Sequence, residues 1–214
     1  MRDEKDYDLM LKHKGKGVFP LSSRDLEWGG AVLGQAFMHD PMIVYIIPEE
    51  RKRMYIVPWY MTRLLAYSYR YGYAYATSSK DGVIFFLPPG ETELSYPRMF
   101  WAGMLGAPVK LGVTACIRLL RVAAATDKLH AQYAPPSHYY LFGLGVNPSS
   151  QGKGLGSYLL DLLLQRCDVE HVPCYLETHS EHNISLYKRH GFDVVVDAEI
   201  VSGKLRIWGM RRES

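Results

Sequence analysis

The sequence has few cysteines, no long uninterrupted apolar run and no large excess of charge, and each shortage argues against a class of protein. Its three cysteines are an odd number without CxxC spacing, which fits neither a disulfide framework nor a zinc site. Reduced, buried thiols and no bound metal are therefore expected. The most apolar stretches, such as residues 113–125, are broken by Arg118 and Arg121, so no segment is expected to span a membrane.

The net charge of +3 is too small to indicate a nucleic-acid partner by itself. The first ten residues, MRDEKDYDLM, do not have the basic-then-apolar order of a signal peptide, and a cytoplasmic location is expected. Internal repeats and low-complexity segments are also missing from the sequence. With 214 residues, of which 48% are hydrophobic, the chain suits a single domain with a substantial hydrophobic core.

The first half of the chain, to about residue 138, is expected to hold helices and one hairpin. Residues 1–20 fit an edge strand or a loose tail. The serines at 22–23 are N-cap candidates for a first helix. Pro48 and the charged residues after it mark a second helix start, and Pro58 divides or reopens that helix.

Period-two patterning predicts strands at Tyr73–Thr77 and Val83–Leu87, joined as an antiparallel hairpin. Residues 91–108 are poorly patterned and fit a loop with short helices. Leu111–Thr126 has the spacing of an amphipathic helix. Its inward face is expected to consist of Val113, Cys116, Ile117 and Leu120.

The most informative stretch is Leu141–Gly156, LFGLGVNPSSQGKGLG. Its short apolar run predicts a buried strand, and the leucine spacing that begins at Leu155 predicts a helix. The glycines between them allow positive φ angles, and the helix start directs unpaired N–H groups at the same place. Such a unit binds a phosphate or pyrophosphate, although a plain strand-to-helix turn is the alternative.

The chain then continues with further strands and one short helix. Pro173–Thr178 predicts a strand, and His182–His190 predicts a helix with Asn183 at its N-cap. Residues 192–200 and 204–210 predict a final hairpin. The second half therefore reads β, α, β, α, β, β, and the whole chain predicts a mixed α/β domain.

Two linked motifs resemble the GNAT superfamily of acetyl-CoA-dependent N-acetyltransferases. The first is the family signature (Q/R)xxGx(G/A), which QGKGLG fills with Gln151, Gly154 and Gly156. The second is LETHSEHNISLYKRHGF, which contains Asn183 and Tyr187 in the family's order. AFMHDP, FFLPPG and GMRR also look like the puromycin-N-acetyltransferase-like branch of that superfamily.

The resemblance implies a single α/β (α+β) domain with a central mixed, mostly antiparallel sheet flanked by helices. Residues from about 139 to 214 would bind acetyl-CoA, and residues 1 to about 138 would hold the acceptor, a small-molecule or peptide amine. The strand before the loop would contact the pantetheine arm, and the loop would hold the pyrophosphate. The implied cofactor-binding residues are Leu144, Gly145, Val146, Gln151, Gly152, Lys153, Gly154, Leu155, Gly156, Ser157, Asn183 and Tyr187.

The resemblance also implies catalytic roles. Tyr187 would be the general acid that protonates the CoA thiolate, because a phenol with a pKa of about 10 suits a thiol leaving group; a merely buried aromatic is the alternative. Glu177 would be the base, with His179 as runner-up unless it is a solvated loop imidazole. The Val146 N–H is a candidate donor to the thioester oxygen, and Asn183 would bond the pantetheine or cap its helix.

Other readings of the glycine loop are disfavoured. A Walker-type loop needs GxxxxGK(S/T), which the sequence lacks, and a dinucleotide-binding loop needs GxGxxG directly after a strand. A GNAT-fold protein that binds acyl-CoA as a sensor without transfer remains open. The acceptor amine and the choice between monomer and homodimer are also open.

Overall fold

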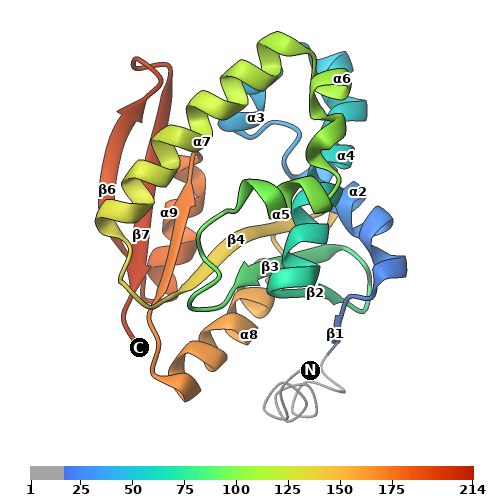
Figure 1. Cartoon of the computed structure of the whole chain (residues 1–214). Coiled ribbons are helices and arrows are strands. Elements are labelled where there is room, and N and C mark those ends of the chain that lie inside the picture. Colours follow the sequence, from blue (N-terminus) through green and yellow to red (C-terminus); the bar gives the residue numbers. More distant parts are fainter. Residues whose placement is uncertain (1–16) are drawn as a thin grey trace.

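The computed structural model describes residues 17–214, except for the side chain of Tyr96 (Figure 1). The strands are β1 (Val18–Pro20), β2 (Tyr73–Thr77), β3 (Gly82–Leu87), β4 (Tyr139–Val146), β5 (Cys174–Thr178), β6 (Asp193–Ile200) and β7 (Leu205–Arg212). The α-helices are α2 (Leu26–Ala36), α3 (Pro41–Ile46), α4 (Glu50–Tyr71), α5 (Tyr96–Trp101), α6 (Ala107–Leu111), α7 (Val113–Tyr133), α8 (Leu155–Glu170) and α9 (Glu181–Arg189). Short 3-10 turns are η1 (Ser23–Asp25), η2 (Met104–Gly106) and η3 (Pro148–Ser150).

The strands form one seven-stranded sheet in the order β1-β2-β3-β4-β5-β7-β6. All neighbours pair antiparallel except β4 and β5, which run parallel. The crossover between these two strands contains α8, as parallel neighbours require. The expected mixed, mostly antiparallel sheet flanked by helices is therefore confirmed.

Alternating side chains of the sheet belong to two separate cores. On β2 and β3, Ala74, Ala76 and Phe85 pack with the core that includes α2, α3, α4 and α7. Tyr75 and Phe86, on the other face, pack with leucines of α8 and with α9. The period-two pattern thus places the first-half helices on one face of the sheet and α8 and α9 on the other.

Small residues on α2 allow α4 to approach closely. A Cβ atom at Gly34 would lie 2.7 Å from a side-chain carbon of Pro58, and one at Gly30 would lie 1.9 Å from Thr62 Oγ1. The Thr62 hydroxyl also donates to the Pro58 carbonyl at 2.9 Å. Helix α4 continues without a break through Pro58. The expectation that Pro58 divides or reopens that helix was wrong.

Most expected elements are present. The hairpins, the strand at β5 and the helix at α8 are confirmed, whereas helix α3 was not predicted. The part of the expected N-terminal strand or tail before residue 17 lies outside the described residues, and β1 is an edge strand. None of the helices between residues 17 and 214 combines the length and apolar character needed to cross a membrane.

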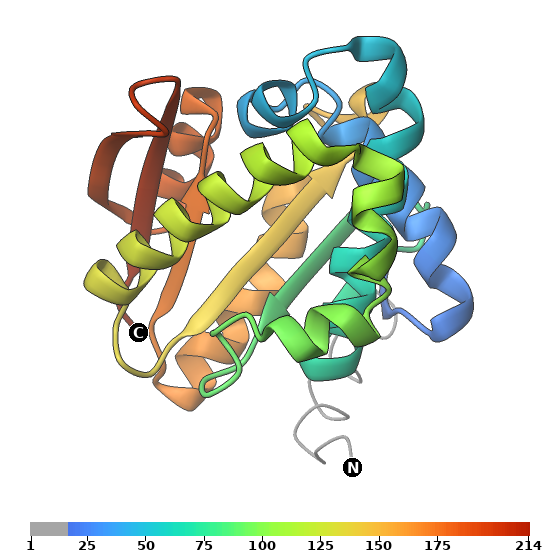
Figure 2. The same cartoon turned by 45° about the horizontal axis from the view of Figure 1, so that its top comes forward.

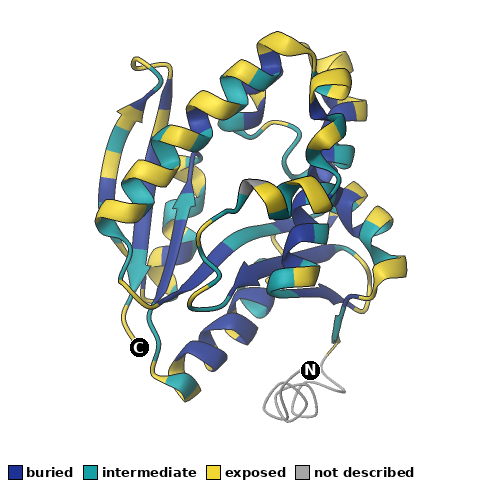
Figure 3. Ribbon diagram, in the orientation of Figure 1, coloured by how far each residue is buried: buried dark blue, intermediate teal, exposed yellow. Residues whose placement is uncertain are grey.

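Helix α7 turns a different face inward from the one expected. Val113, Ile117 and Leu120 are 71%, 46% and 56% exposed, whereas Ala115 and Val122 are buried. Figure 3 shows the contrast between the mixed colouring of α7 and the largely buried α8. The amphipathic pattern was misread because α7 lies across an open part of the sheet, where apolar side chains line a cavity and its mouth.

Candidate active site

Strands β4 and β5 separate soon after they begin. They pair only at Tyr139 with Cys174 and at Tyr140 with Tyr175, although β4 continues to Val146. Figure 2 shows the two strands diverging, with α7 crossing in front. Beyond Tyr140, the edge of β4 that faces β5 therefore has no strand partner among the described residues, and its backbone groups are open to another partner.

A bulge on β4 lies at this opening. Phe85 pairs with Gly143 and Phe86 with Leu141, so Phe142 is the extra residue on β4. Gly143 allows the fit, because a Cβ atom there would lie 2.2 Å from the Phe85 ring. Bulges bend a strand and redirect its side chains, and this one bends β4 beside the opening.

A cavity of about 490 Å³ occupies the opening and continues beneath α7. Its wall includes Leu141–Leu144 of β4, Glu177 to His179 at the end of β5, and Asn183 and Tyr187 of α9. Side chains of α4, α5 and α7 complete it on the other face of the sheet. The cavity therefore connects the two faces of the sheet and brings both predicted catalytic residues to one space.

Glu177 is a buried carboxylate that makes no hydrogen bond of good geometry with the described residues. Its side chain is 4% exposed, and among the described residues neither carboxylate oxygen accepts a bond of good geometry. His130 Nδ1 lies 3.2 Å from Oε1. The negative charge of Glu177, after burial, also raises the pKa values of the neighbouring Tyr140 and Tyr175 hydroxyls. A carboxylate in such surroundings is poised to accept a proton or a cation.

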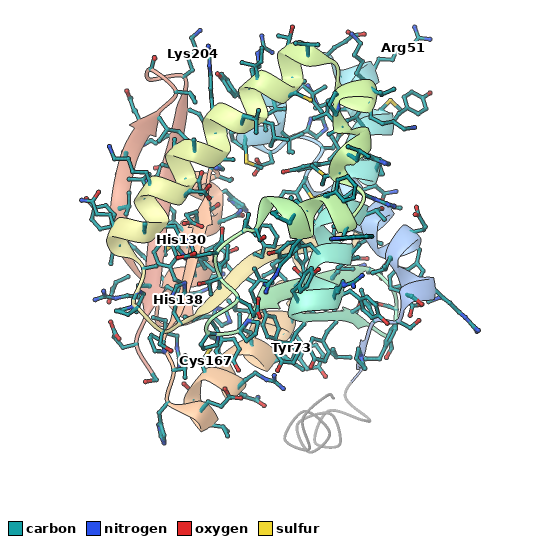
Figure 4. The ribbon with its side chains drawn as sticks, in the orientation of Figure 1. Arg51, Tyr73, His130, His138, Cys167 and Lys204 are labelled. Carbon is teal, nitrogen blue, oxygen red and sulfur yellow. The ribbon has the colours of Figure 1, made fainter. Side chains whose placement is uncertain are left out.

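His130, which contacts Glu177, lies beside a second histidine, His138 (Figure 4). His138 Nδ1 donates to the Pro135 carbonyl at 2.6 Å, because a carbonyl can only accept. Burial, and then the charge of His130, lower the pKa of His138 to about 4, so its Nε2 is an acceptor at neutral pH. His130 Nε2 lies 3.0 Å from that atom and must donate to it. His130 therefore turns Nδ1 toward Glu177.

Tyr187 lies on α9 and is 7% exposed. Burial raises the pKa of its phenol well above the ordinary value, with smaller contributions from Cys174 and Asp40, so the hydroxyl keeps its proton at neutral pH. Its ring meets Phe192 edge to face at 5.8 Å. Tyr187 therefore packs against Phe192 and also lines the cavity.

Asn183 is not the N-cap of its helix, which corrects the prediction. Helix α9 begins at Glu181 with Ser180 as N-cap, so the helix starts one residue before the predicted range and its cap lies three residues before Asn183. Asn183 instead donates from Nδ2 to Thr178 Oγ1 at 3.4 Å and lines the cavity. The misplacement arose because Ser180 and Asn183 are both good capping residues.

His179 is not a solvated loop imidazole. It is 9% exposed and lines the cavity. Its Nδ1 lies 2.9 Å from the Arg206 carbonyl and donates to it, which leaves Nε2 as the nitrogen available to accept. Nearby Asp40 caps α3 by accepting from the N–H groups of Met42 and Ile43, and burial raises its pKa.

The predicted anion loop has the backbone that the glycines suggested. Gly152 and Gly154 have φ angles of +76° and +80°, and no atom lies within 4 Å of where their Cβ atoms would be. Gly154 is the N-cap of α8, and no described side chain caps that helix. Leu155, Gly156 and Ser157 form its first turn, which also lacks an acidic residue. Its first N–H groups are therefore available to an anion.

Gln151 and Lys153 lie on the exposed side of the loop, and their side chains make different contacts. Gln151 Nε2 donates to the Val146 carbonyl at 3.1 Å, so its side chain folds back onto the end of β4. Lys153 Nζ is 3.5 Å from Ser150 Oγ. Lys153 is exposed and places a positive charge beside the start of α8.

The three β4 residues predicted to contact a cofactor have separate environments. Leu144 lines the cavity. Gly145 faces α2, because a Cβ atom there would lie 2.9 Å from Leu33 and 3.0 Å from Ala36. Val146 pairs with Gly82 of β3, at the loop end of the strand. Packing against α2 therefore accounts for the glycine at 145.

Sequence reasoning missed the contribution of α7 and the loop after it. Asp127 lines the cavity, His130 contacts Glu177, and His138 orients His130. These residues precede Glu177 by 39 to 50 positions and belong to no recognised motif. Among residues 17–214, no group of three or more potential ligands is placed to hold a metal ion.

Comparison with known proteins points to one family. Residues 87–192 match the Acetyltransferase (GNAT) family, a span that contains β4, the glycine loop, Glu177 and Tyr187. An uncharacterized N-acetyltransferase of Schizosaccharomyces pombe is 24% identical over 179 residues, which are 80% of this chain and 72% of that protein. Mycothiol acetyltransferase of Propionibacterium freudenreichii is 40% identical over 97 residues, which are 44% of this chain and 28% of that protein.

Solved structures share the fold at low sequence identity. The histone acetyltransferase HPA2 and related acetyltransferase from Corynebacterium glutamicum gives a TM-score of 0.63 at 22% identity, covering 92% of this chain and 96% of that one. Arylalkylamine N-acetyltransferase 2 from Aedes aegypti gives 0.62 at 14% identity, covering 92% and 97%. At these identities the likeness supports the fold alone.

Proposed function

The chain belongs to the acetyltransferase (GNAT) family through its domain at residues 87–192, and on that basis we propose that it transfers an acetyl group from acetyl-CoA to a primary amine. Transfer is direct, within a ternary complex. One observation carries the proposal: a single cavity at the opening between β4 and β5 is lined by Glu177, Tyr187 and the open edge of β4. A base, an acid and a backbone track for the donor are thus gathered around one space.

The pyrophosphate of acetyl-CoA would bind at the start of α8. The positive φ angles of Gly152 and Gly154 expose successive backbone N–H groups, and the uncapped first turn of α8 adds the positive end of the helix dipole. Lys153 supplies a nearby positive charge. Residues Gln151 to Ser157 therefore fit an anionic group without further rearrangement.

The pantetheine arm would lie along β4 like an added strand. From Leu144 to Val146 the strand has β3 on one side and no strand on the other, so backbone groups at that edge can bond an extended amide chain. Asn183 would bond the arm from α9. The thioester would lie beside β4, and its position decides the donor to its oxygen. The Val146 N–H stays the predicted donor for a thioester at the loop end of the strand, whereas a thioester at the bulge near Phe142, four residues away, would need another donor.

Glu177 is the proposed base. The acceptor enters as an ammonium ion, and Glu177 removes one proton to give the free amine. The amine nitrogen then bonds the thioester carbonyl carbon, the carbon–sulfur bond breaks, and the nitrogen loses a second proton as the amide forms. His179, through Nε2, is the second candidate for these proton transfers.

Tyr187 is the proposed acid. Its buried phenol holds its proton at neutral pH and passes it to the departing thiolate sulfur, which otherwise would leave as an anion in an apolar space. The products are the N-acetyl amide and the CoA thiol, with one proton released overall. The tyrosine is then reprotonated from solvent before the next cycle.

His130 is a proposed positioning residue for Glu177. The bond from its Nε2 to His138 fixes the ring, so that Nδ1 stays toward the carboxylate. Asp127, Tyr140 and Tyr175 also face this group. With Nε2 donating to His138, Nδ1 of a neutral His130 can accept the proton that Glu177 has taken from the ammonium, and the doubly protonated ring would then donate from Nδ1 to the carboxylate.

The two halves of the chain would bind different substrates. Residues from about 139 to 214 supply the donor site, and residues before about 138 supply the walls that meet the acceptor. The acceptor class, the cytoplasmic location and the choice between monomer and homodimer stay predictions. The three cysteines are free thiols.

The direct test is consumption of acetyl-CoA. Purified protein is incubated with acetyl-CoA and a panel of primary amines, and released thiol is measured together with the mass of the acetylated amine. We expect thiol release that depends on the amine and yields the N-acetyl product. Tight binding of acetyl-CoA with no acetylation of any amine would instead support the sensor reading.

A further inference from the structure

The acceptor side of the cavity carries one buried carboxylate that makes no hydrogen bond of good geometry with residues 17–214. The side chain of Glu177 is 4% exposed, and the groups beside it, His130 and the hydroxyls of Tyr140 and Tyr175, do not meet its oxygens with good geometry. A buried carboxylate without such hydrogen bonds is costly, and in native proteins such a group has a functional explanation. A ligand that donates hydrogen bonds and carries positive charge would satisfy it.

The walls of the cavity are mostly apolar. On the face of the sheet covered by α4, α5 and α7, most lining side chains offer no hydrogen bonds, with Tyr60 and Thr126 as the uncharged polar exceptions on those helices. The apolar side chains include Met61 and Leu64 of α4, Met99 of α5, and Leu119, Val122 and Ala123 of α7. A ligand in this space can therefore bury hydrocarbon, but it finds few partners for hydroxyl or amide groups.

The charged side chains that line the cavity are of one sign. Among the described residues they are Asp40, Asp127 and Glu177, and His179 is the histidine that also lines the cavity. No lysine or arginine from that part of the chain joins them. Asp127 lies on the exposed side of α7, where its carboxylate attracts cations toward the cavity.

We infer that the acceptor is a small primary monoamine with an apolar alkyl or aryl body, held by its ammonium group at Glu177 with the body against α4, α5 and α7. The inference rests on the proposed function and narrows it to a substrate class. A cavity of about 490 Å³ lies in the range of small-molecule sites, and part of it must take the acyl end of the donor.

Other amine classes fit the same space poorly. An amino acid would bring a carboxylate next to Glu177 and Asp127, with no lysine or arginine in the described wall to pair it. An aminoglycoside would leave many hydroxyl groups unsatisfied against the leucine and methionine side chains. An apolar monoamine has no charged or hydrogen-bonding group besides its ammonium, so it needs no further partner in the cavity.

A matched pair of ligands tests the inference on the wild-type protein. 2-Phenylethylamine and phenylalanine share an aromatic body and an amino group and differ by one carboxylate, and ethanolamine and kanamycin serve as polar amines. Thiol release gives kcat/KM, and calorimetry in the presence of CoA gives amine binding. We expect 2-phenylethylamine to exceed each of the other three by at least about 100-fold in kcat/KM or in affinity.

A second experiment tests whether the amine binds in the cavity. Ala123 lines the cavity and its neighbour Ala124 is exposed, so Ala123→Phe and Ala124→Phe add the same ring inside and outside. We expect Ala123→Phe to lower kcat/KM or affinity for 2-phenylethylamine at least about tenfold, with acetyl-CoA binding unchanged. The Ala124→Phe variant should behave as the wild type.

The outcomes separate the two proposals. Preference for phenylalanine, ethanolamine or kanamycin, or equal effects of the two alanine variants, would overturn the inferred substrate class while leaving acetyl transfer intact. Selective binding of 2-phenylethylamine without acetylation of any amine would support the ligand class and overturn the proposed function.

Discussion

Glu177 is the residue on which the proposed chemistry depends most. We expect Glu177→Gln to lower kcat by about 10² to 10⁴-fold, because the amide cannot remove a proton from the ammonium. The variant should be at least as stable as the wild type, since a neutral amide costs less to bury than an unpaired carboxylate. Thiol release and thermal unfolding measure the two effects.

The matched control for this variant is Glu50→Gln, at an exposed position in the first turn of α4. It should keep wild-type activity. An activity of Glu177→Gln within threefold of the wild type would exclude Glu177 as the base and favour His179.

Tyr187 offers an independent test of the acid. Removing its hydroxyl as Tyr187→Phe preserves the packing against Phe192 and should lower kcat by about 100-fold, with little change in the KM for acetyl-CoA. The exposed Tyr55, at 75% exposure, gives the control Tyr55→Phe. Equal rates for the two variants would reduce Tyr187 to a packing role.

His138 links the site to the pH dependence of stability. Its pKa is about 4 in the folded protein against about 6.5 when unfolded, so between these values the unfolded chain binds more protons, and stability falls as the pH drops. His138 should account for about 2 kcal/mol of the loss between about pH 7.5 and about pH 5. Urea unfolding at both pH values compares the wild type with His138→Gln.

In the His138→Gln variant that part of the pH dependence should disappear. Curves that fall by the same amount in both proteins would show that His138 is not held neutral by its burial.

The residue-level predictions came from local motifs. Tyr187 was identified from the resemblance of LETHSEHNISLYKRHGF to the family, and it lines the same cavity as Glu177, while its role as acid stays a prediction. Asp127, His130 and His138 were missed, because their meeting with Glu177 depends on how α7 crosses the sheet. No spacing along the chain encodes that crossing.

Among the elements, the glycine loop before α8 makes the sharpest prediction. An alanine in place of Gly154, whose φ is +80°, costs about 1 kcal/mol in backbone strain and tilts the N–H groups of the loop. We expect Gly154→Ala to raise the KM for acetyl-CoA about fivefold or more while kcat changes little. Initial rates at varied acetyl-CoA measure this directly.

Gly90, with a φ of +83° and open space around its Cβ position, provides the control. Gly90→Ala should cost similar stability and leave that KM unchanged. If both variants changed the KM equally, the loop at 151–156 would not be the site of the pyrophosphate.

At the scale of elements, strands were easier to predict than helix faces. The alternation in β2 and β3 gave the hairpin, since each face of the sheet packs against its own core. The face of α7 was wrong because Leu120 lines an open cavity and stays 56% exposed, while the core takes Ala115 and Val122 instead. Pro58 was misjudged because α4 continues through it from Glu50 to Tyr71, and its close packing against Gly34 of another helix is not visible in the local sequence.

For the whole molecule, the decisive feature is the separation of β4 from β5 after two paired positions. Local patterns predicted both strands, but the opening arises from the bulge at Phe142 and from the elements packed on either face. Under the proposed function, it would give the donor a track on one side and the acceptor an apolar space on the other. Both substrates would then be present at once.

The most direct measurement is the initial rate over a grid of acetyl-CoA and 2-phenylethylamine concentrations, or any other amine that the panel shows to be acetylated. Direct transfer in a ternary complex predicts intersecting lines in double-reciprocal plots, with no thiol released when the amine is omitted. Parallel lines, together with a burst of thiol in the absence of amine, would indicate an acetylated enzyme and contradict the account.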